Sequence, residues 1–161
     1  IGKSIASGMP LSGVLTTPEI ADGLKEQVIS TFQQHPVSME AALATLDIFE
    51  TDGVVERNRT LAAHLGRRAC EFLGELEHVA EVRQCGMIVA AELARGADRS
   101  RPFDWRERRG LRVYRHGLEH EALLRPIGNV VYFMPPYVVT PEQIDRLVDT
   151  ARAGIEAATC D

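Results

Sequence analysis

The chain has few cysteines, and their positions match no common pattern of disulfide or metal binding. Cys70, Cys85 and Cys160 are the only three among 161 residues, and none of them forms a CxxC pair. An odd number of widely spaced thiols is typical of reduced cysteines in the cytoplasm. The sequence therefore predicts neither a disulfide framework nor a metal site, and it favours a cytoplasmic location.

Long apolar runs and stretches of positive charge are also missing. No run approaches the ~20 apolar residues of a membrane-spanning helix, and we expect no signal peptide. The net charge is −5 at pH 7, without a basic stripe that would attract nucleic acid. The arginine-rich run 99–115 also contains Asp104 and Glu107, which favours a solvated loop and helix face over a binding patch. We therefore expect neither a membrane nor nucleic acid as a partner.

What the chain does contain is the composition of a globular protein. Apolar residues make up 45% of it and charged residues 25%, and the length is enough for a domain with a core. The sequence begins at Ile1, directly before a Gly/Ser-rich segment that carries a lysine. This start predicts a piece of a longer protein.

The first half of the sequence predicts mostly helix. The run Leu11–Thr16 is β-like, and the tripeptide Thr17-Pro18-Glu19 after it is typical of a helix start. We expect that first helix to end near residue 26. Apolar side chains at helical spacing predict two further helices, over residues 37–50 and 53–77.

The second half predicts the order strand, strand, helix, twice over. Short strands joined by tight turns pair antiparallel, so this half predicts an α+β domain in which helices pack on a sheet. Within it, Thr140 to Gln143 reads as a capping box that opens the last helix. The predicted elements are two strands in 79–93 around Gly86, a helix over 105–120, strands Leu123–Leu124 and Val130–Phe133 joined by a Pro-x-Gly turn, and the last helix.

Arg125 is a candidate ligand for an anion. It follows Leu123 and Leu124 and precedes Pro126, and a guanidinium in apolar surroundings is costly unless it meets a negative charge. Its planar fork suits a carboxylate. Two structural alternatives remain at this point, because the side chain could also reach the surface or pair with an internal Asp or Glu.

Lys3 is a candidate nucleophile. It stands between Gly2 and Ser4, and small neighbours let a ligand come close to the backbone. A lysine whose pKa is lowered by desolvation or by a nearby cation can attack a carbonyl group. A lysine in a Gly/Ser loop is more often a solvated surface residue, so the position alone does not decide.

Two segments resemble a known family. The string RPIGNVVYFMPPY at 125–137 resembles the C-terminal segment of class III (fold type I) pyridoxal-phosphate aminotransferases, and GKSIASGMPLSGVLTT at 2–17 resembles their lysine segment. The resemblance implies that Lys3 is catalytic and holds the cofactor pyridoxal 5'-phosphate, that Arg125 binds the substrate carboxylate, and that Tyr132 faces the substrate. It also implies an α/β to α+β fold, in which residues 1–50 end the large cofactor domain and residues 51–161 form the small domain.

A third segment bears on the cofactor phosphate. Thr31-Phe32 followed by His35-Pro36 resembles the family's Thr-Phe-x-Gly-x-Pro loop, although Gln34 stands where glycine is usual. The resemblance implies that Thr31, with its neighbour Ser30, contacts the phosphate bound by the neighbouring subunit of a homodimer. Thr31 could equally be a simple turn residue before the helix. For His35 the sequence favours a helix cap or a packing residue over a base.

The resemblance finally implies ping-pong transamination of small-molecule substrates. The pattern Tyr132-x-Met134-Pro135-Pro136-Tyr137 is most similar to the branch that uses S-adenosylmethionine as amino donor and 8-amino-7-oxononanoate as acceptor in biotin biosynthesis. Two alternatives stay open, namely a 4-aminobutyrate or ω-amino acid type of transaminase, and a non-catalytic module. We expect the fragment by itself to be inactive.

Overall fold

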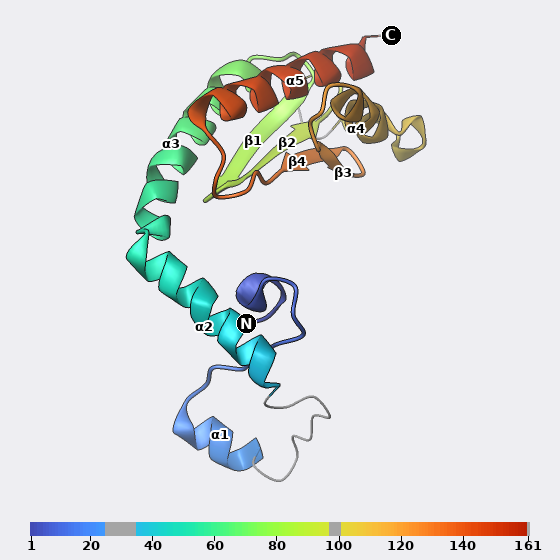
Figure 1. Cartoon of the computed structure of the whole chain (residues 1–161). Coiled ribbons are helices and arrows are strands. Elements are labelled where there is room, and N and C mark those ends of the chain that lie inside the picture. The colour runs from blue at the N-terminus through green and yellow to red at the C-terminus, as the bar shows by residue number, and fades with distance from the viewer. Residues whose placement is uncertain (25–34, 97–100, 161) are drawn as a thin grey trace. The chain divides into compact units, whose positions relative to one another are not determined.

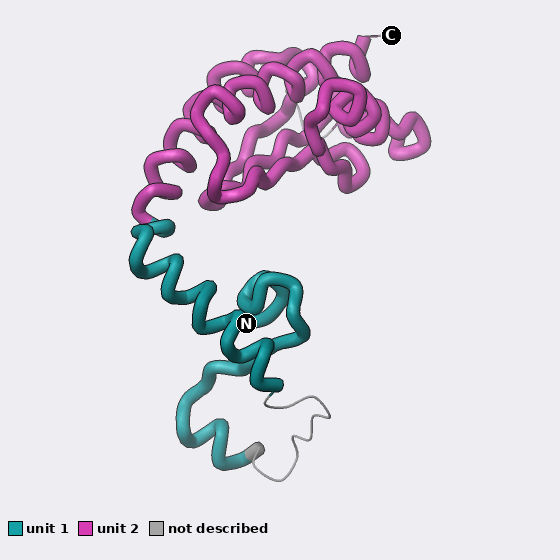
Figure 2. The backbone as a smooth tube through the Cα atoms, in the orientation of Figure 1, with its two compact units in different colours: residues 1–55 teal, residues 56–161 magenta. Residues whose placement is uncertain are grey.

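The computed structural model describes residues 1–24, 35–96 and 101–160, and the chain divides into two compact units. Figure 2 shows these units, residues 1–55 and residues 56–161. Each unit is described by itself below.

The first unit is helical, as its sequence predicts. Pro18 begins the first α-helix, as the Thr-Pro-Glu start predicts, and the backbone carbonyl of Thr17 accepts the bond from Ala21 N at 3.0 Å. The long helix of this unit begins after His35, whose ring caps it, and ends before Gly53, which has a φ of 55°. The elements, labelled in Figure 1, are η1 (Lys3–Ala6), α1 (Pro18–Leu24) and α2 (Pro36–Thr51).

The predicted β-like run Leu11–Thr16 is wrong for this structure, since its residues form no strand. Val14 and Leu15 are 87% and 81% exposed. A strand needs a partner for its backbone N–H and C=O groups, and the described residues of the first unit provide none. Side chains that favour strands are therefore not enough to make this run a strand.

The second unit is an α+β domain, which confirms the predicted fold class. Its four strands form one antiparallel sheet in the order β1-β2-β4-β3. Gly86, at a φ of 55°, lies in the tight turn between the first two strands, where the sequence predicts it. The elements are α3 (Val54–Leu73), β1 (Val79–Cys85), β2 (Ile88–Leu93), η2 (Trp105–Glu107), α4 (Arg109–Glu119), β3 (Arg125–Ile127), β4 (Val130–Phe133) and α5 (Pro141–Thr159).

The core of the second unit lies between one face of the sheet and its helices. Burial alternates along β2 and β4, so that Val89, Ala91, Leu93, Val131 and Phe133 are buried while their neighbours are not. Helices α3, α4 and α5 contribute their apolar faces to the same cluster (Figure 1). The opposite face of the sheet keeps half-exposed side chains, among them that of Tyr132.

Two predictions about element ends have different outcomes. The capping box is confirmed, because Thr140 Oγ1 accepts from Gln143 N at 3.3 Å and Gln143 Oε1 accepts from Thr140 N at 3.0 Å. The strand predicted at Leu123–Leu124 is wrong, because β3 begins at Arg125. The turn is formed by Gly128 and Asn129, with a φ of 59° at the glycine, while Pro126 lies within β3. Proline is tolerated there because β3 is an edge strand.

No helix in the ranges that the structure describes is long and apolar enough to cross a membrane.

Candidate functional site

The β3–β4 hairpin brings Arg125 and Tyr132 together, as their proposed shared role requires. The two residues are direct partners in the antiparallel register, so their side chains leave the same face of the hairpin. The guanidinium carbon of Arg125 lies 5.7 Å from the centre of the Tyr132 ring, within the range of a cation–π contact. The tyrosine thus supports the arginine from one side and leaves the hydrogen-bonding edge of its fork available.

A cavity of about 600 Å³ lies beside this pair. Its walls are largely apolar, with Leu123, Met134 and Pro135 among them. Arg146 also lines the cavity, but its guanidinium donates to Glu121 at 2.8 Å. Arg125 forms no ion pair within residues 1–24, 35–96 and 101–160, which argues against an internal carboxylate partner in that part of the chain. The arrangement can bind a molecule that carries a carboxylate on an apolar chain.

Lys3 lies in the first unit and has an unusual backbone conformation. Its φ is 54°, in the left-handed region that non-glycine residues rarely adopt. It opens the short helix η1 after Gly2, and Ser7 and Gly8 at the end of that turn also have positive φ. The side chain is exposed and has no ion pair among the described residues. A strained turn with an accessible amine fits a lysine that binds a cofactor covalently.

The helix α2 helps to hold this turn. Ser7 Oγ lies 3.1 Å from Thr45 Oγ1, whose hydroxyl donates to Ala41 O at 2.8 Å. Ala6, at the end of η1, is fully buried. Within the first unit, the lysine turn is therefore packed on a regular helix, which limits its freedom.

The other predicted residues of the first unit have separate outcomes. Ser30 and Thr31 lie outside the described residues, so their contact with a cofactor phosphate stays a prediction. His35 is a helix cap, as the sequence favours, because its Nδ1 accepts from Ser38 N at 3.3 Å and lies 3.1 Å from Ser38 Oγ. Lys3 and Arg125 belong to different units, and the structure describes each with its own surroundings.

Arg109 corrects the prediction for the arginine-rich run. That run was expected to be solvated, yet Arg109 is only 2% exposed. Its Nε donates to Glu107 Oε2 at 2.6 Å, and its Nη1 donates to Ala158 O at 2.9 Å. Burial is possible because these acceptors replace water around the guanidinium. The run is therefore not a solvated face at this position, although Arg106 and Arg108 are exposed.

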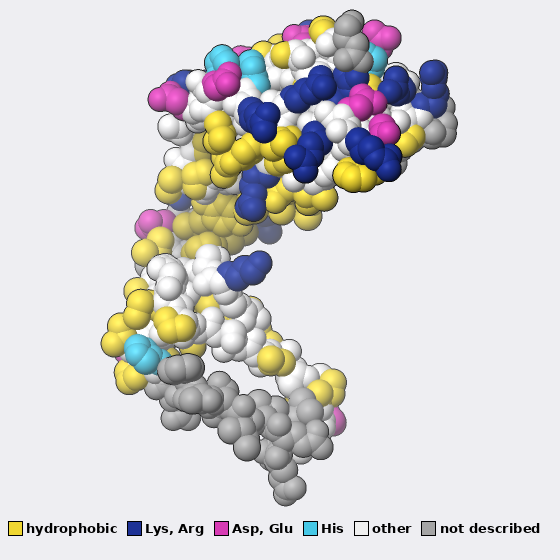
Figure 3. Space-filling model, turned by 90° about the vertical axis from the view of Figure 1, so that its right-hand side faces the viewer, with side chains coloured by type: hydrophobic (Ala, Val, Ile, Leu, Met, Phe, Trp, Pro, Cys, Tyr) yellow, Lys and Arg dark blue, Asp and Glu magenta, His cyan; other side chains and the backbone are white. Residues whose placement is uncertain are grey.

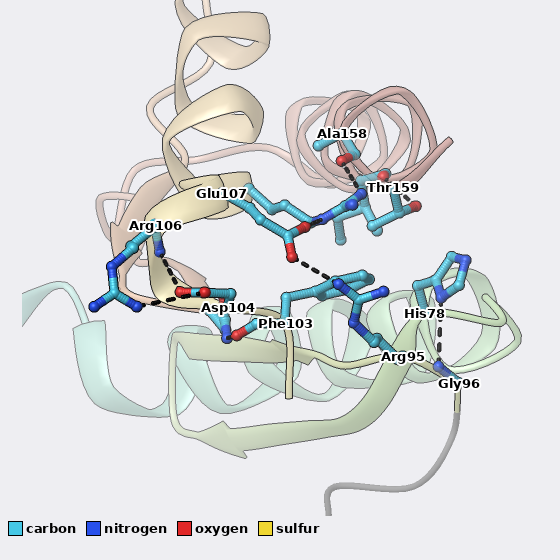
Figure 4. A network of polar contacts seen from close by, with 12 residues as sticks. His78, Arg95, Gly96, Phe103, Asp104, Arg106, Glu107, Ala158 and Thr159 are labelled. Atoms are coloured by element: carbon cyan, nitrogen blue, oxygen red, sulfur yellow. Dashed lines mark hydrogen bonds and ion pairs between the residues drawn. The ribbon is translucent and has the colours of Figure 1, made fainter. Parts of the chain in front are cut away.

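Figure 4 shows how this network joins the end of α5 to the loop before η2. Glu107 also accepts from Arg95 Nη2 at 2.7 Å. The hydrogen bond from Arg109 is the main cause that lowers the pKa of the Glu107 carboxyl, and the charges of Arg109 and Arg95 act in the same direction. The ring of Phe103 lies under Arg109, 4.1 Å from the guanidinium carbon. In the sequence, this network is indicated only by Glu107 and Arg109 standing two positions apart, shortly after Phe103.

Figure 3 shows Arg side chains scattered among hydrophobic ones on one face of the second unit, without a continuous basic stripe on that face. Cys70, Cys85 and Cys160 are free thiols. Among the described residues, no group of three His, Cys, Asp or Glu side chains could hold a metal ion.

Comparison with known proteins identifies the family. The sequence model of the family described as Aminotransferase class-III matches residues 1–154. Adenosylmethionine-8-amino-7-oxononanoate aminotransferase of Geobacter sulfurreducens is 39% identical over 168 residues, which cover 99% of this chain and 37% of that protein. The crystal structure of the enzyme of that name from Methanocaldococcus jannaschii is similar with a TM-score of 0.88 at 33% identity, over 99% of this chain and 38% of the other. Isoleucine 2-epimerase of Lentilactobacillus buchneri is 32% identical, over 97% of this chain and 35% of that protein. The chain thus spans little more than a third of the length of these relatives, and it belongs to the class-III aminotransferase family.

Proposed function

We propose that the chain is part of an aminotransferase that moves an amino group from S-adenosylmethionine to 8-amino-7-oxononanoate. The product is 7,8-diaminononanoate, in biotin biosynthesis. The names of the relatives from G. sulfurreducens and M. jannaschii support this pair of substrates. The observation that carries the proposal is Arg125, which faces Tyr132 beside an apolar cavity and has no carboxylate partner in the described part of the chain.

In this proposal Lys3 holds pyridoxal 5'-phosphate, the cofactor of the family. The cofactor supplies an electron sink for the substrate carbon. Once the cofactor has passed to the substrate, the freed and exposed amine of Lys3 would move the proton from the substrate carbon to the cofactor carbon, first as general base and then as general acid. The strained turn at φ 54° supports this role because strain of this kind gathers at functional sites.

Arg125 and Tyr132 hold the acceptor. The guanidinium binds the carboxylate of the keto acid in bidentate fashion, and the apolar walls of the cavity contact its carbon chain. Tyr132 lines the path and keeps the guanidinium oriented through the contact at 5.7 Å. Positioning of this kind raises the reaction rate, because the substrate has already lost its translational and rotational freedom when the reaction begins.

The proposal also covers the parts of the enzyme beyond these two sites. Residues 1–50 form the end of the large cofactor domain, and residues 51–161 form the small C-terminal domain. The enzyme is a cytoplasmic homodimer in which Ser30 and Thr31 bind the cofactor phosphate of the partner subunit. A hydroxyl with backbone N–H groups can hold a phosphate without adding charge.

A second candidate is another class III transaminase, of the 4-aminobutyrate or ω-amino acid type. The 28% identity to a probable 4-aminobutyrate aminotransferase of Bacillus subtilis, over 98% of this chain, supports it. The two candidates differ in the amino donor. Substrate profiling of the whole enzyme separates them, since the first requires S-adenosylmethionine and the second accepts simple amino acids or amines.

The test of the first candidate is Arg125→Ala in the full-length enzyme. We expect kcat/KM for the keto acid to fall roughly 100-fold, because a charge-assisted pair is lost. We expect kcat/KM for the amino donor to change far less, because the donor reacts in the other half-reaction of a ping-pong enzyme, in which Arg125 has no proposed role. The matched control is Arg115→Ala, which removes an exposed guanidinium of the second unit that does not line the cavity. Equal losses for both substrates would contradict a carboxylate-binding role.

A further inference from the structure

The short strand β3 does not by itself fix the position of Arg125. β3 has three residues, it is an edge strand paired only with β4, and its middle residue is Pro126, which has no N–H to donate. Arg125 is its first residue. A strand with so few bonds needs outside support if its side chain is to keep one orientation. Helix α4 packs on β3 and gives part of that support, and the turn at the other end of β3 can give another part.

Asn129, in the β3–β4 turn, ties the hairpin to a distant loop. Its side-chain Nδ2 donates to Phe103 O at 2.7 Å, across 26 positions of sequence. Its backbone O separately accepts from Leu93 N at 2.9 Å. The side-chain bond can therefore be removed by mutation while the backbone bond between the turn and β2 remains.

The loop that receives this bond is itself well anchored. Phe103 is 5% exposed, and its ring contacts Arg109 at 4.1 Å. Just before it, Pro102 forms an isolated bridge with Ala94, and Arg95 N donates to Arg101 O at 2.8 Å. The Phe103 backbone is thus held beside the network of Figure 4, in which Arg109 is buried. A hydrogen bond to the Phe103 carbonyl oxygen can therefore hold the β3–β4 turn in one position.

Two further observations favour a positioning role for this contact. Asn129 Oδ1 has no protein hydrogen-bond partner in the described part of the chain, so among the described residues the side-chain amide is tied to the protein through Nδ2. On the other side of the hairpin, Gly110 lies so close that an added Cβ would clash with Gly128 O. The turn is therefore held between helix α4 and the Phe103 loop.

We propose that Asn129 is a positioning residue, which orients the Arg125 guanidinium for the substrate carboxylate by fixing the β3–β4 turn to Phe103 O. This inference rests on the proposed function, because it takes Arg125 as the residue that binds the keto acid. Asn129 lies at the turn, and it acts only through the hairpin that carries Arg125 and Tyr132.

The experiment compares Asn129→Ala with Gln84→Ala in the full-length enzyme. Gln84 is a matched control, since its Nε2 also donates to backbone carbonyls, those of Ala62 and Gly86, but it lies on β1 at the opposite edge of the sheet. We expect Asn129→Ala to lower kcat/KM for the keto acid roughly 10- to 100-fold, as misplacement of a binding group does. We expect kcat for the donor half-reaction to stay near that of the parent, and Gln84→Ala to leave both unchanged.

The readout that separates positioning from mere stability is a double-mutant cycle. In the Arg125→Ala background, Asn129→Ala should cause no further loss for the keto acid, because the group it orients is gone. An equal loss in both backgrounds, or a loss no larger than that of Gln84→Ala, would overturn the proposal. Asn129→Ser, which keeps a polar turn residue too short to reach Phe103 O, decides the matter if the alanine variant does not fold. If Arg125→Ala alone leaves the keto acid unaffected, the proposed function fails together with this inference.

Discussion

At the scale of single residues, surroundings decide what a guanidinium does in this domain. Arg109 is 2% exposed and its nitrogens donate to Glu107 and to Ala158 O, so it serves the fold. Arg125 is exposed and has no ion pair in the described ranges, and its guanidinium stands over an aromatic ring beside a cavity. A charged group that the fold leaves unpaired beside a cavity is available to a ligand.

The lowered pKa of the Glu107 carboxyl predicts that the chain loses folding stability in acid. Arg109 and Arg95 hold its pKa below the ordinary value of 4.5 in the folded state. The unfolded chain then binds a proton at higher pH than the folded chain does, so the stabilisation is present above pH 4.5 and is lost as the pH falls through the lower, folded pKa. We expect Glu107→Gln to reduce stability at neutral pH and to flatten its decline in acid.

Denaturant unfolding of the chain at a series of pH values measures this effect. The control is Glu119→Gln, which removes an exposed carboxylate at the end of α4 that has no ion pair among the described residues. A parallel decline in acid for the parent and the Glu107 variant would show that the carboxyl does not titrate as its surroundings require.

Which residues matter could be predicted from the sequence only in part. The sequence indicates Arg125 through its apolar neighbours and Tyr132 through the resemblance to the family, whereas their direct pairing in the hairpin is a finding of the structure. Arg109 was missed because its acceptor Ala158 O lies 49 positions away. Nothing local in an arginine-rich run tells which of its members will be buried.

At the scale of elements, the start of α5 is set by a local signal. Thr140 and Gln143 each satisfy a backbone N–H of the other, and these bonds involve only neighbouring residues. Thr140→Ala should lower the free energy of unfolding by about 1 kcal/mol, because the backbone N–H of Gln143 loses its acceptor. Chemical denaturation followed by circular dichroism measures the change.

A threonine in the middle of the same helix provides the comparison. Thr150 Oγ1 donates to Arg146 O at 2.8 Å, a bond to a carbonyl that the helix already uses. We expect Thr150→Ala to be close to neutral, since alanine is the better helix former. Equal destabilisation by both variants would contradict the capping role, because a hydroxyl at the start of α5 would then stabilise the fold no more than one in the middle of the helix.

Helices were predicted more accurately than strands for a physical reason. The helices were found within a few residues because their bonds and caps are local. The strand at Leu123–Leu124 was misplaced because Leu124 is fully buried without belonging to a strand. The run Leu11–Thr16 has the right side chains, but a strand also needs a partner. Both errors concern pairing, which a single segment cannot reveal.

At the scale of the whole molecule, the proposed chemistry needs both units. Lys3 is in the first and Arg125 is in the second, and a transaminase needs a group for the proton as well as a group for the substrate carboxylate. The chain covers 37% of its relative from G. sulfurreducens. The proposed activity therefore belongs to the complete enzyme, and its test uses the full-length protein.

Lysine is scarce in this chain, which makes the central claim simple to test. Lys3 and Lys25 are the only lysines in its 161 residues. A covalent label on this part of the enzyme can therefore be assigned to one of two positions by peptide mapping.

The most direct measurement is an absorbance spectrum of the full-length protein with pyridoxal phosphate, before and after borohydride reduction, followed by peptide mapping. The account predicts a visible band that disappears on reduction, with the cofactor then fixed to the peptide that contains Lys3. Absence of the band, or a label on Lys25 or on another lysine, would contradict the assignment of Lys3 and favour a non-catalytic role for the chain.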